Sequence, residues 1–211
     1  MSDLGSYKRA QEARRALFNR GCRHLLDADG AEDAAVAQHE ASHALTGRLL
    51  GLDATAATVE PGARFAGMTF CASAPDRAFD TIVMLMAGNE GEKLFGGGSD
   101  NGCKNDLRQA RALAASISDD VKGTIKRARR CARKILVANF VPLTKLALAL
   151  IEPRTLDAAE IEELIAANAP DDDASDGGDD DAELLASDRD PILMRMLGPR
   201  LVHYGSPGEI L

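Results

Sequence analysis

The sequence predicts a mainly α (α+β) domain with a small β-sheet. Apolar residues recur at helical spacing over most of the chain, whereas residues 54–70 have the composition of short strands. The chain has no Trp and only two Tyr, so its core is expected to consist of Ala, Leu, Ile, Val and Met on helices. A length of 211 residues suits one domain of about 150 residues with tails.

The first half of the chain predicts three helices and the sheet. Residues 8–27 form an amphipathic pattern within an N-terminal segment, 1–30, that is expected to pack on the domain. A second helix follows Asp29 and Gly30 and ends near Gly51. Two short strands are predicted in 54–70, and a third helix has its apolar body at 79–87 and ends before the glycines at 96–98.

The second half predicts four more helices. One begins near Asn105, and its predicted buried side consists of Leu107, Ala110, Leu113, Ala114 and Ile117. Another extends from Asp119 to about Phe140 and is ended by Pro142. Two shorter helices follow at 143–151 and 156–167, and the second of these has Asp157 and Glu160 in a capping-box arrangement.

We expect the folded domain to span 31–168, and composition marks its C-terminal end. Residues 169–183 contain the acidic run DDDASDGGDDDAE, which has no apolar residues to bury and is expected to be a disordered linker. A C-terminal tail segment, 184–211, regains apolar residues.

Charge and hydropathy argue against two classes of partner, nucleic acids and membranes. The formal net charge of -8 argues against general attraction to nucleic acid. No apolar run approaches the roughly 18 residues that would span a bilayer, and the N-terminus lacks the pattern of a secretory signal. We therefore expect a cytoplasmic protein without a membrane partner. The four cysteines form no C-x-x-C pair, so neither a cysteine zinc ribbon nor a redox dithiol is indicated.

The stretch AVAQHEASHAL in the second helix carries an H-E-x-x-H motif. Side chains four residues apart on a helix point the same way, so His39 and His43 can occupy two corners of one tetrahedral zinc site. Glu40 can then accept a proton from a zinc-bound water. The alternative is a pair of surface histidines on a helix.

A catalytic zinc requires a third protein ligand. Thr46 and Leu49 stand where the longer motif H-E-x-x-H-x-x-G-x-x-H has its Gly and third His, so that class of metallopeptidase is excluded. The carboxylates of Glu90, Glu92 and Asp106 remain as candidates, and their spacing does not choose among them.

Four ordered blocks resemble the zinc peptidase domain of the FtsH-type ATP-dependent proteases. They are AVAQHEASHAL, AGNEGEKLFGGG, the segment around KNDLRQARALA, and LIEPRTLDAAEIEELI. They are similar, in the same order, to that family's HEAGH helix, its AGRAAEELIFG helix, its TGASNDL segment and its closing helix, over residues 32 to about 167. The resemblance implies a zincin-like helical peptidase domain with the small sheet beside the HExxH helix.

The resemblance also implies roles for single residues. His39, His43 and Asp106 would bind Zn²⁺, and Glu40 would be the catalytic base. Glu92 and Asn105 would support the ligands from outside the coordination sphere. The substrate-binding strand would comprise Ala66, Gly67, Met68 and Thr69, beside which a polypeptide substrate adds as an extended strand.

The chain departs from the family pattern at several positions. Ser42 replaces a Gly, Asn89 and Glu90 replace Arg and Ala, and Cys103 and Lys104 replace Ala and Ser. No G-x-x-x-x-G-K-[ST] phosphate loop occurs in the sequence, so any ATPase partner is expected to act in trans. The family's ring assemblies leave a homo-oligomer open.

The expected function is that of a zinc metalloendopeptidase acting on unfolded or flexible polypeptides. A zinc-binding pseudopeptidase that serves as an adaptor is one alternative, although an adaptor does not need Glu40. The other is a nucleic-acid-binding module that uses the basic residues of 122–134, which is disfavoured because aromatic residues for base stacking are absent there.

Overall fold

The computed structural model describes residues 28–62, 66–71, 75–97 and 103–168, together with the single residues 12 and 16. The elements in order are α2 (Ala28–Leu49), β1 (Ala54–Thr58), β2 (Met68–Cys71), the short 3-10 helix η1 (Pro75–Arg77), α3 (Ala78–Leu94), α4 (Lys104–Ile117), α5 (Val121–Ala138), α6 (Phe140–Ile151), β3 (Thr155–Asp157) and α7 (Ala158–Ala166). The predicted mainly helical fold with a small sheet is confirmed. The expected N-terminal helix, acidic linker and C-terminal tail segment lie outside these ranges.

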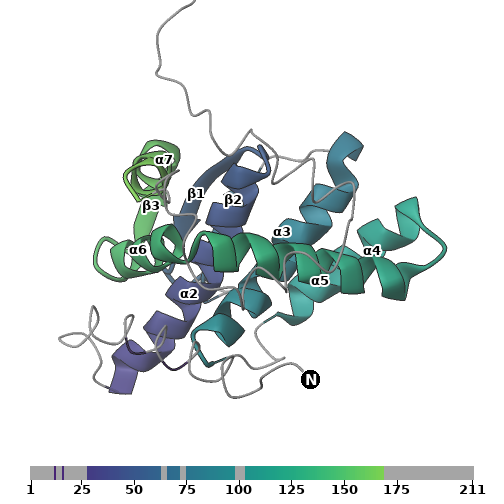
Figure 1. Cartoon of the computed structure of the whole chain (residues 1–211). Helices are drawn as coiled ribbons and strands as arrows, with labels where there is room; N and C mark the ends of the chain where they lie inside the picture. The colour runs from purple at the N-terminus through teal and green to yellow at the C-terminus, as the bar shows by residue number, and fades with distance from the viewer. Residues whose placement is uncertain are drawn as a thin grey trace, which may run out of the picture. The chain divides into compact units, whose positions relative to one another are not determined.

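Helix α2 is the central element, and it packs against α3, α6 and the sheet (Figure 1). Its buried apolar residues are mostly alanines, among them Ala37, Ala41 and Ala44, which are at most 1% exposed. Because alanine adds little bulk beyond the backbone, neighbouring helices can approach α2 closely, and its polar side chains meet groups from several elements.

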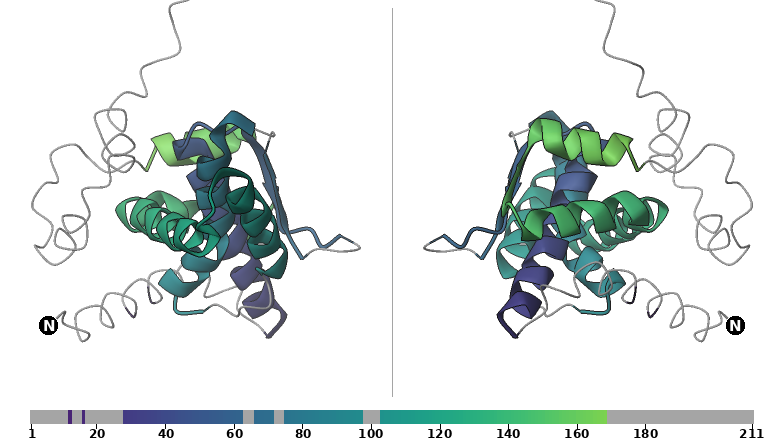
Figure 2. Two further views of the ribbon diagram at one scale, coloured as in Figure 1. Left: turned by 90° about the vertical axis from the view of Figure 1, so that its right-hand side faces the viewer. Right: turned by 90° about the vertical axis from the view of Figure 1, so that its left-hand side faces the viewer.

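The sheet has three antiparallel strands in the order β2-β1-β3 and stands along one side of the helices (Figure 2). Ala57 in the central strand pairs with Thr69 on β2 and with Leu156 on β3. Directly paired residues point to the same face of a sheet. Ala57 and Leu156 are buried, so this face is the one that packs on α2.

The third strand corrects the expected helix at 156–167. Leu156 pairs with Ala57 in the sheet, and its side chain is only 4% exposed. The helix begins one residue after Asp157, whose carboxylate accepts from the backbone N–H of Glu160 while the Glu160 carboxylate accepts from that of Asp157. The predicted capping box is therefore confirmed.

Two further details differ from expectation. Ile117, at the end of α4, was predicted to be buried but is 47% exposed, since the buried positions of this helix are Ala110 and Ala114. The break after α5 falls at Asn139 rather than at Pro142, which lies in the first turn of α6. Proline fits there because the first backbone N–H groups of a helix have no partner within it.

No single helix in the described ranges is long and apolar enough to cross a membrane. Only α5 and α6 taken together reach that length and composition, and they are bent by 86° at the break between them.

Candidate metal centre

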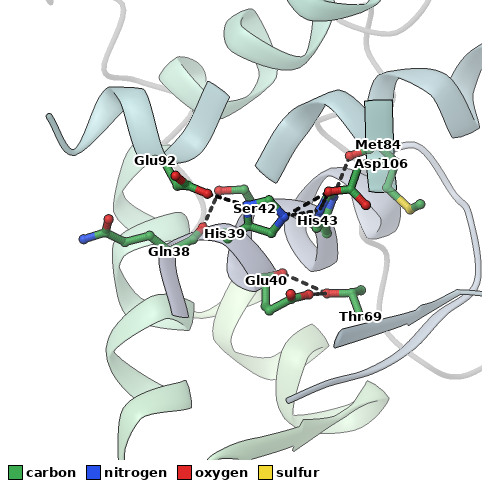
Figure 3. A network of polar contacts seen from close by, with 9 residues as sticks. All are labelled: Gln38, His39, Glu40, Ser42, His43, Thr69, Met84, Glu92 and Asp106. Atoms are coloured by element: carbon green, nitrogen blue, oxygen red, sulfur yellow. Dashed lines mark hydrogen bonds and ion pairs between the residues drawn. The ribbon is translucent and has the colours of Figure 1, made fainter. Parts of the chain in front are cut away.

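Helix α2 presents His39 and His43 toward α3, and Glu40 toward the sheet (Figure 3). Successive helical residues are about 100° apart around the axis, so a residue that follows His39 directly must face a different neighbour. The Glu40 carboxylate accepts a hydrogen bond from Thr69 on β2.

The partners of the Nδ1 atoms fix the tautomers of both histidines. His43 Nδ1 lies 2.8 Å from the backbone oxygen of Met84, and His39 Nδ1 lies 2.6 Å from Oε1 of Glu92. A carbonyl or an ionised carboxylate can only accept, so each Nδ1 carries the proton and donates it. In the neutral imidazoles both Nε2 atoms therefore present lone pairs.

These two Nε2 atoms converge with a carboxylate oxygen from α4. The Nε2 atoms are 2.9 Å apart, and Asp106 Oδ2 lies 3.2 Å from Nε2 of His39 and 3.5 Å from that of His43. Two atoms that each lie about 2.0–2.1 Å from a tetrahedral zinc ion are about 3.3 Å apart. Three lone-pair-bearing atoms this close repel one another unless a proton or a metal ion lies between them, and the group can hold a metal ion.

The charges around His39, His43 and Asp106 also favour a positive charge among these side chains. Burial lowers the pKa of His39, but the carboxylates of Asp106, Glu92 and Glu40 outweigh burial and raise that pKa to about 10. Burial raises the pKa of Asp106, but hydrogen bonds and charge from His39 and His43 dominate and hold it well below its usual range. Without a metal, a proton therefore takes the cation's place.

Gly88 on α3 makes room for the two imidazoles. A Cβ atom there would lie 2.5 Å from Cε1 and Nε2 of His39 and 2.6 Å from Nε2 of His43. Sequence reasoning missed this residue. The available signal was a pair of glycines three residues apart, Gly88 and Gly91, within the predicted helix.

Gly91 explains how the chain accommodates Ser42, which departs from the family pattern. A Cβ at Gly91 would overlap Oγ of Ser42 and lie 2.7 Å from its Cβ. The serine hydroxyl donates to the backbone oxygen of Gln38 at 2.6 Å and is fully buried. Where α2 crosses α3, the glycine (Gly91) lies on α3 and the larger serine (Ser42) lies on α2.

The other third-ligand candidates occupy different positions. Glu92 binds the Nδ1 side of His39, away from the converging atoms, and so orients that ring. Glu90 is directed toward α5, with its oxygens 3.1 Å from Nζ of Lys93 and 3.6 Å from Nη1 of Arg133. Asp106 is the candidate that the structure brings to both histidines.

Of the remaining predicted site residues, some lie near Glu40 and others lie at the surface. Asn105 is exposed, and its Oδ1 accepts from Arg108 at 2.8 Å, so it faces away from the metal group. Met68 and Thr69 belong to the edge strand β2, whereas Ala66 and Gly67 precede it. A Cβ at Gly67 would lie 2.8 Å from Cγ of Glu40, so this part of the chain passes directly over the Glu40 side chain.

Comparison with known proteins adds no family assignment. No protein-family model matches the chain, and a search of curated proteins returned no significant match. The resemblance to the FtsH-type peptidase domain therefore stays a prediction.

Proposed function

We propose that the chain is a zinc-dependent metalloendopeptidase related to the peptidase domain of the FtsH-type proteases, acting on unfolded or flexible polypeptides. The observation that carries the proposal is the convergence of His39 Nε2, His43 Nε2 and Asp106 Oδ2 one helical position from the buried carboxylate of Glu40. Two histidines and one carboxylate as ligands, with a second carboxylate nearby as general base, are typical of a hydrolytic zinc site.

The donor atoms favour zinc among the common metals. Imidazole and carboxylate ligands in a three-residue set suit Zn²⁺, whereas Mg²⁺ and Ca²⁺ prefer oxygen ligands alone. Bound there, zinc would lower the pKa of water toward neutrality and polarise a substrate carbonyl. The Nδ1 hydrogen bonds to Met84 and Glu92 would keep both imidazoles in the tautomer and orientation that binding requires.

Glu40 would perform the proton transfers. It takes a proton from the attacking water as the water oxygen bonds to the scissile carbonyl carbon. When the C–N bond breaks, Glu40 returns that proton to the leaving amine, so no further reactant is needed. Glu40 as a whole residue is 6% exposed, so little bulk water surrounds it.

The edge strand β2 would bind the substrate. Among the described residues β2 is an edge strand, and its outer edge would offer backbone N–H and C=O groups to an extended peptide, which would pair with it without reading a particular sequence. Phe70, 47% exposed on this strand, would add apolar contact. Folded substrates would require an ATPase supplied in trans.

The two alternative functions have less support. An adaptor needs neither Glu40 nor its contact with Thr69. A nucleic-acid module would use the basic side chains of α5, yet Arg133 lies next to Glu90 and Lys134 is 7% exposed. Part of the basic run thus faces the protein rather than a phosphate backbone.

The test combines metal analysis with cleavage of unfolded casein. We expect one zinc per chain and cleavage that stops on chelation and returns with zinc. Glu40→Gln should bind zinc normally but lose at least about 100-fold in kcat, because the general base is gone. Glu163→Gln, at an exposed position on α7, is the matched control and should retain full activity. Undiminished cleavage by Glu40→Gln would reject the mechanism.

A further inference from the structure

The Glu40 carboxylate is held from the sheet side by one hydroxyl group. Thr69 Oγ1 lies 2.8 Å from Oε2 of Glu40 and 3.1 Å from its backbone oxygen. A threonine hydroxyl has one proton to donate, and a charged carboxylate oxygen accepts it more strongly than a neutral carbonyl. The bond to Oε2 is therefore the stronger of the two contacts.

The pairing of the sheet directs Thr69 toward Glu40. Thr69 pairs with Ala57, whose side chain is fully buried against α2, so the Thr69 side chain points to the same face. Side chains alternate along a strand, which turns the neighbouring Phe70 to the opposite face. Gly67, two residues before Thr69, allows the backbone to approach within contact distance of Glu40 and Val36.

We propose that Thr69 is a positioning residue for Glu40, an inference that rests on the proposed peptidase function. The hydroxyl engages Oε2 and fixes the carboxylate, which leaves Oε1 to receive the proton of the attacking water. Thr69 also belongs to the strand whose edge would bind the peptide. One strand thus holds both the base and the substrate, and it sets the distance between the base and the scissile bond.

Three substitutions separate positioning from a general structural role. Thr69→Val keeps the shape but removes the donor, and Thr69→Ser keeps the donor. Thr55→Val makes the same change on β1 at an exposed side chain and serves as the matched control. Activity is measured as kcat and KM on a flexible peptide, with the zinc content of each variant determined in parallel.

The expected result is a change in kcat alone. Thr69→Val should lower kcat by about tenfold, the effect of one hydrogen bond to a charged group, with zinc content and KM unchanged. Thr69→Ser should remain within about threefold of wild type, since its hydroxyl can make the same bond. Thr55→Val should match wild type. Wild-type kcat in Thr69→Val, or an equal loss in Thr69→Ser, would overturn the inference.

A second readout needs no activity. Thr69→Val should raise the unfolding constant of the metal-free protein about tenfold, but should change it little in a Glu40→Ala background, because the lost bond is then already absent. Equal effects in both backgrounds would overturn the inference. Failure of the peptidase proposal is recognised separately, by a wild-type protein that cleaves nothing with zinc bound.

Discussion

Gly88 is the residue on which the geometry of the metal group depends most directly. Because a Cβ there would press on both Nε2 atoms, Gly88→Ala is expected to force the imidazoles apart. Zinc content should fall from one per chain to a small fraction, measured by elemental analysis after dialysis. Gly47→Ala, another helical glycine whose Cβ would meet only side chains at 3.3 Å or more, should keep its zinc. Full zinc content in Gly88→Ala would contradict the geometry.

Glu92 and Glu90 are predicted to differ in their effect on metal affinity. Glu92→Ala removes the acceptor for Nδ1 of His39 and should weaken zinc binding by about 10- to 100-fold, as loss of such supporting groups commonly does. Glu90→Ala removes the contacts with Lys93 and Arg133 and should leave the affinity unchanged. Competition against a chromophoric chelator gives both constants. Equal losses would show that the two carboxylates are not distinguished by their contacts.

At the residue scale, spacing predicted that His39 and His43 share one face of α2, because a helix places residues four apart on one face. Spacing left Glu90, Glu92 and Asp106 open as the third ligand. Their roles depend on how α3 and α4 approach α2, which is a matter of distances between elements and not of local sequence.

The crossing of α2 and α3 depends on the pair Ser42 and Gly91. Gly91→Ala should lower the free energy of unfolding by about 1–3 kcal/mol through overpacking against Ser42. The double variant Ser42→Gly, Gly91→Ala exchanges the small and large residues and should recover most of that loss. Urea denaturation of the wild type, the two single variants and the double variant measures the coupling energy between positions 42 and 91. Additive effects would mean that the two positions do not touch.

The helices were predicted more fully than the sheet. An amphipathic pattern repeats over several turns of α4 and α5, and turn residues bound the apolar body of α3, so these three helices were predicted with small errors at their ends. Strand β3 has three residues, too few for any period to appear, and Leu156 adopts strand pairing because Ala57 on β1 lies opposite it. The exposed position of Ile117 likewise follows from where α4 ends relative to its neighbours.

For the whole molecule, a metal ion would link segments that are distant in sequence. His39 and His43 lie on α2 and Asp106 on α4, so a metal ion would bind all three only in the folded chain. With free zinc at a thousandfold excess over Kd, we expect the free energy of unfolding to rise by about 4 kcal/mol. Thermal denaturation with and without a chelator measures the change in Tm.

Asp106→Asn tests whether zinc stabilises the fold through a ligand on α4. It should remove most of the zinc-dependent rise in Tm, because a neutral amide is a poor zinc ligand. Asp119→Asn makes the same change at an exposed position between α4 and α5, and it should keep the full rise. A zinc response that survives in Asp106→Asn would remove Asp106 from the ligand set.

The sequence by itself determined the helical fold class, the face of α2 that carries the histidines and the capping box of α7, because each of these depends on residues within a few positions of one another. The tertiary structure decided the third member of the metal group, the space that Gly88 provides and the contact of Thr69 with Glu40. These depend on side chains that local periodicity cannot relate, since they meet only where α3, α4 and β2 pack against α2.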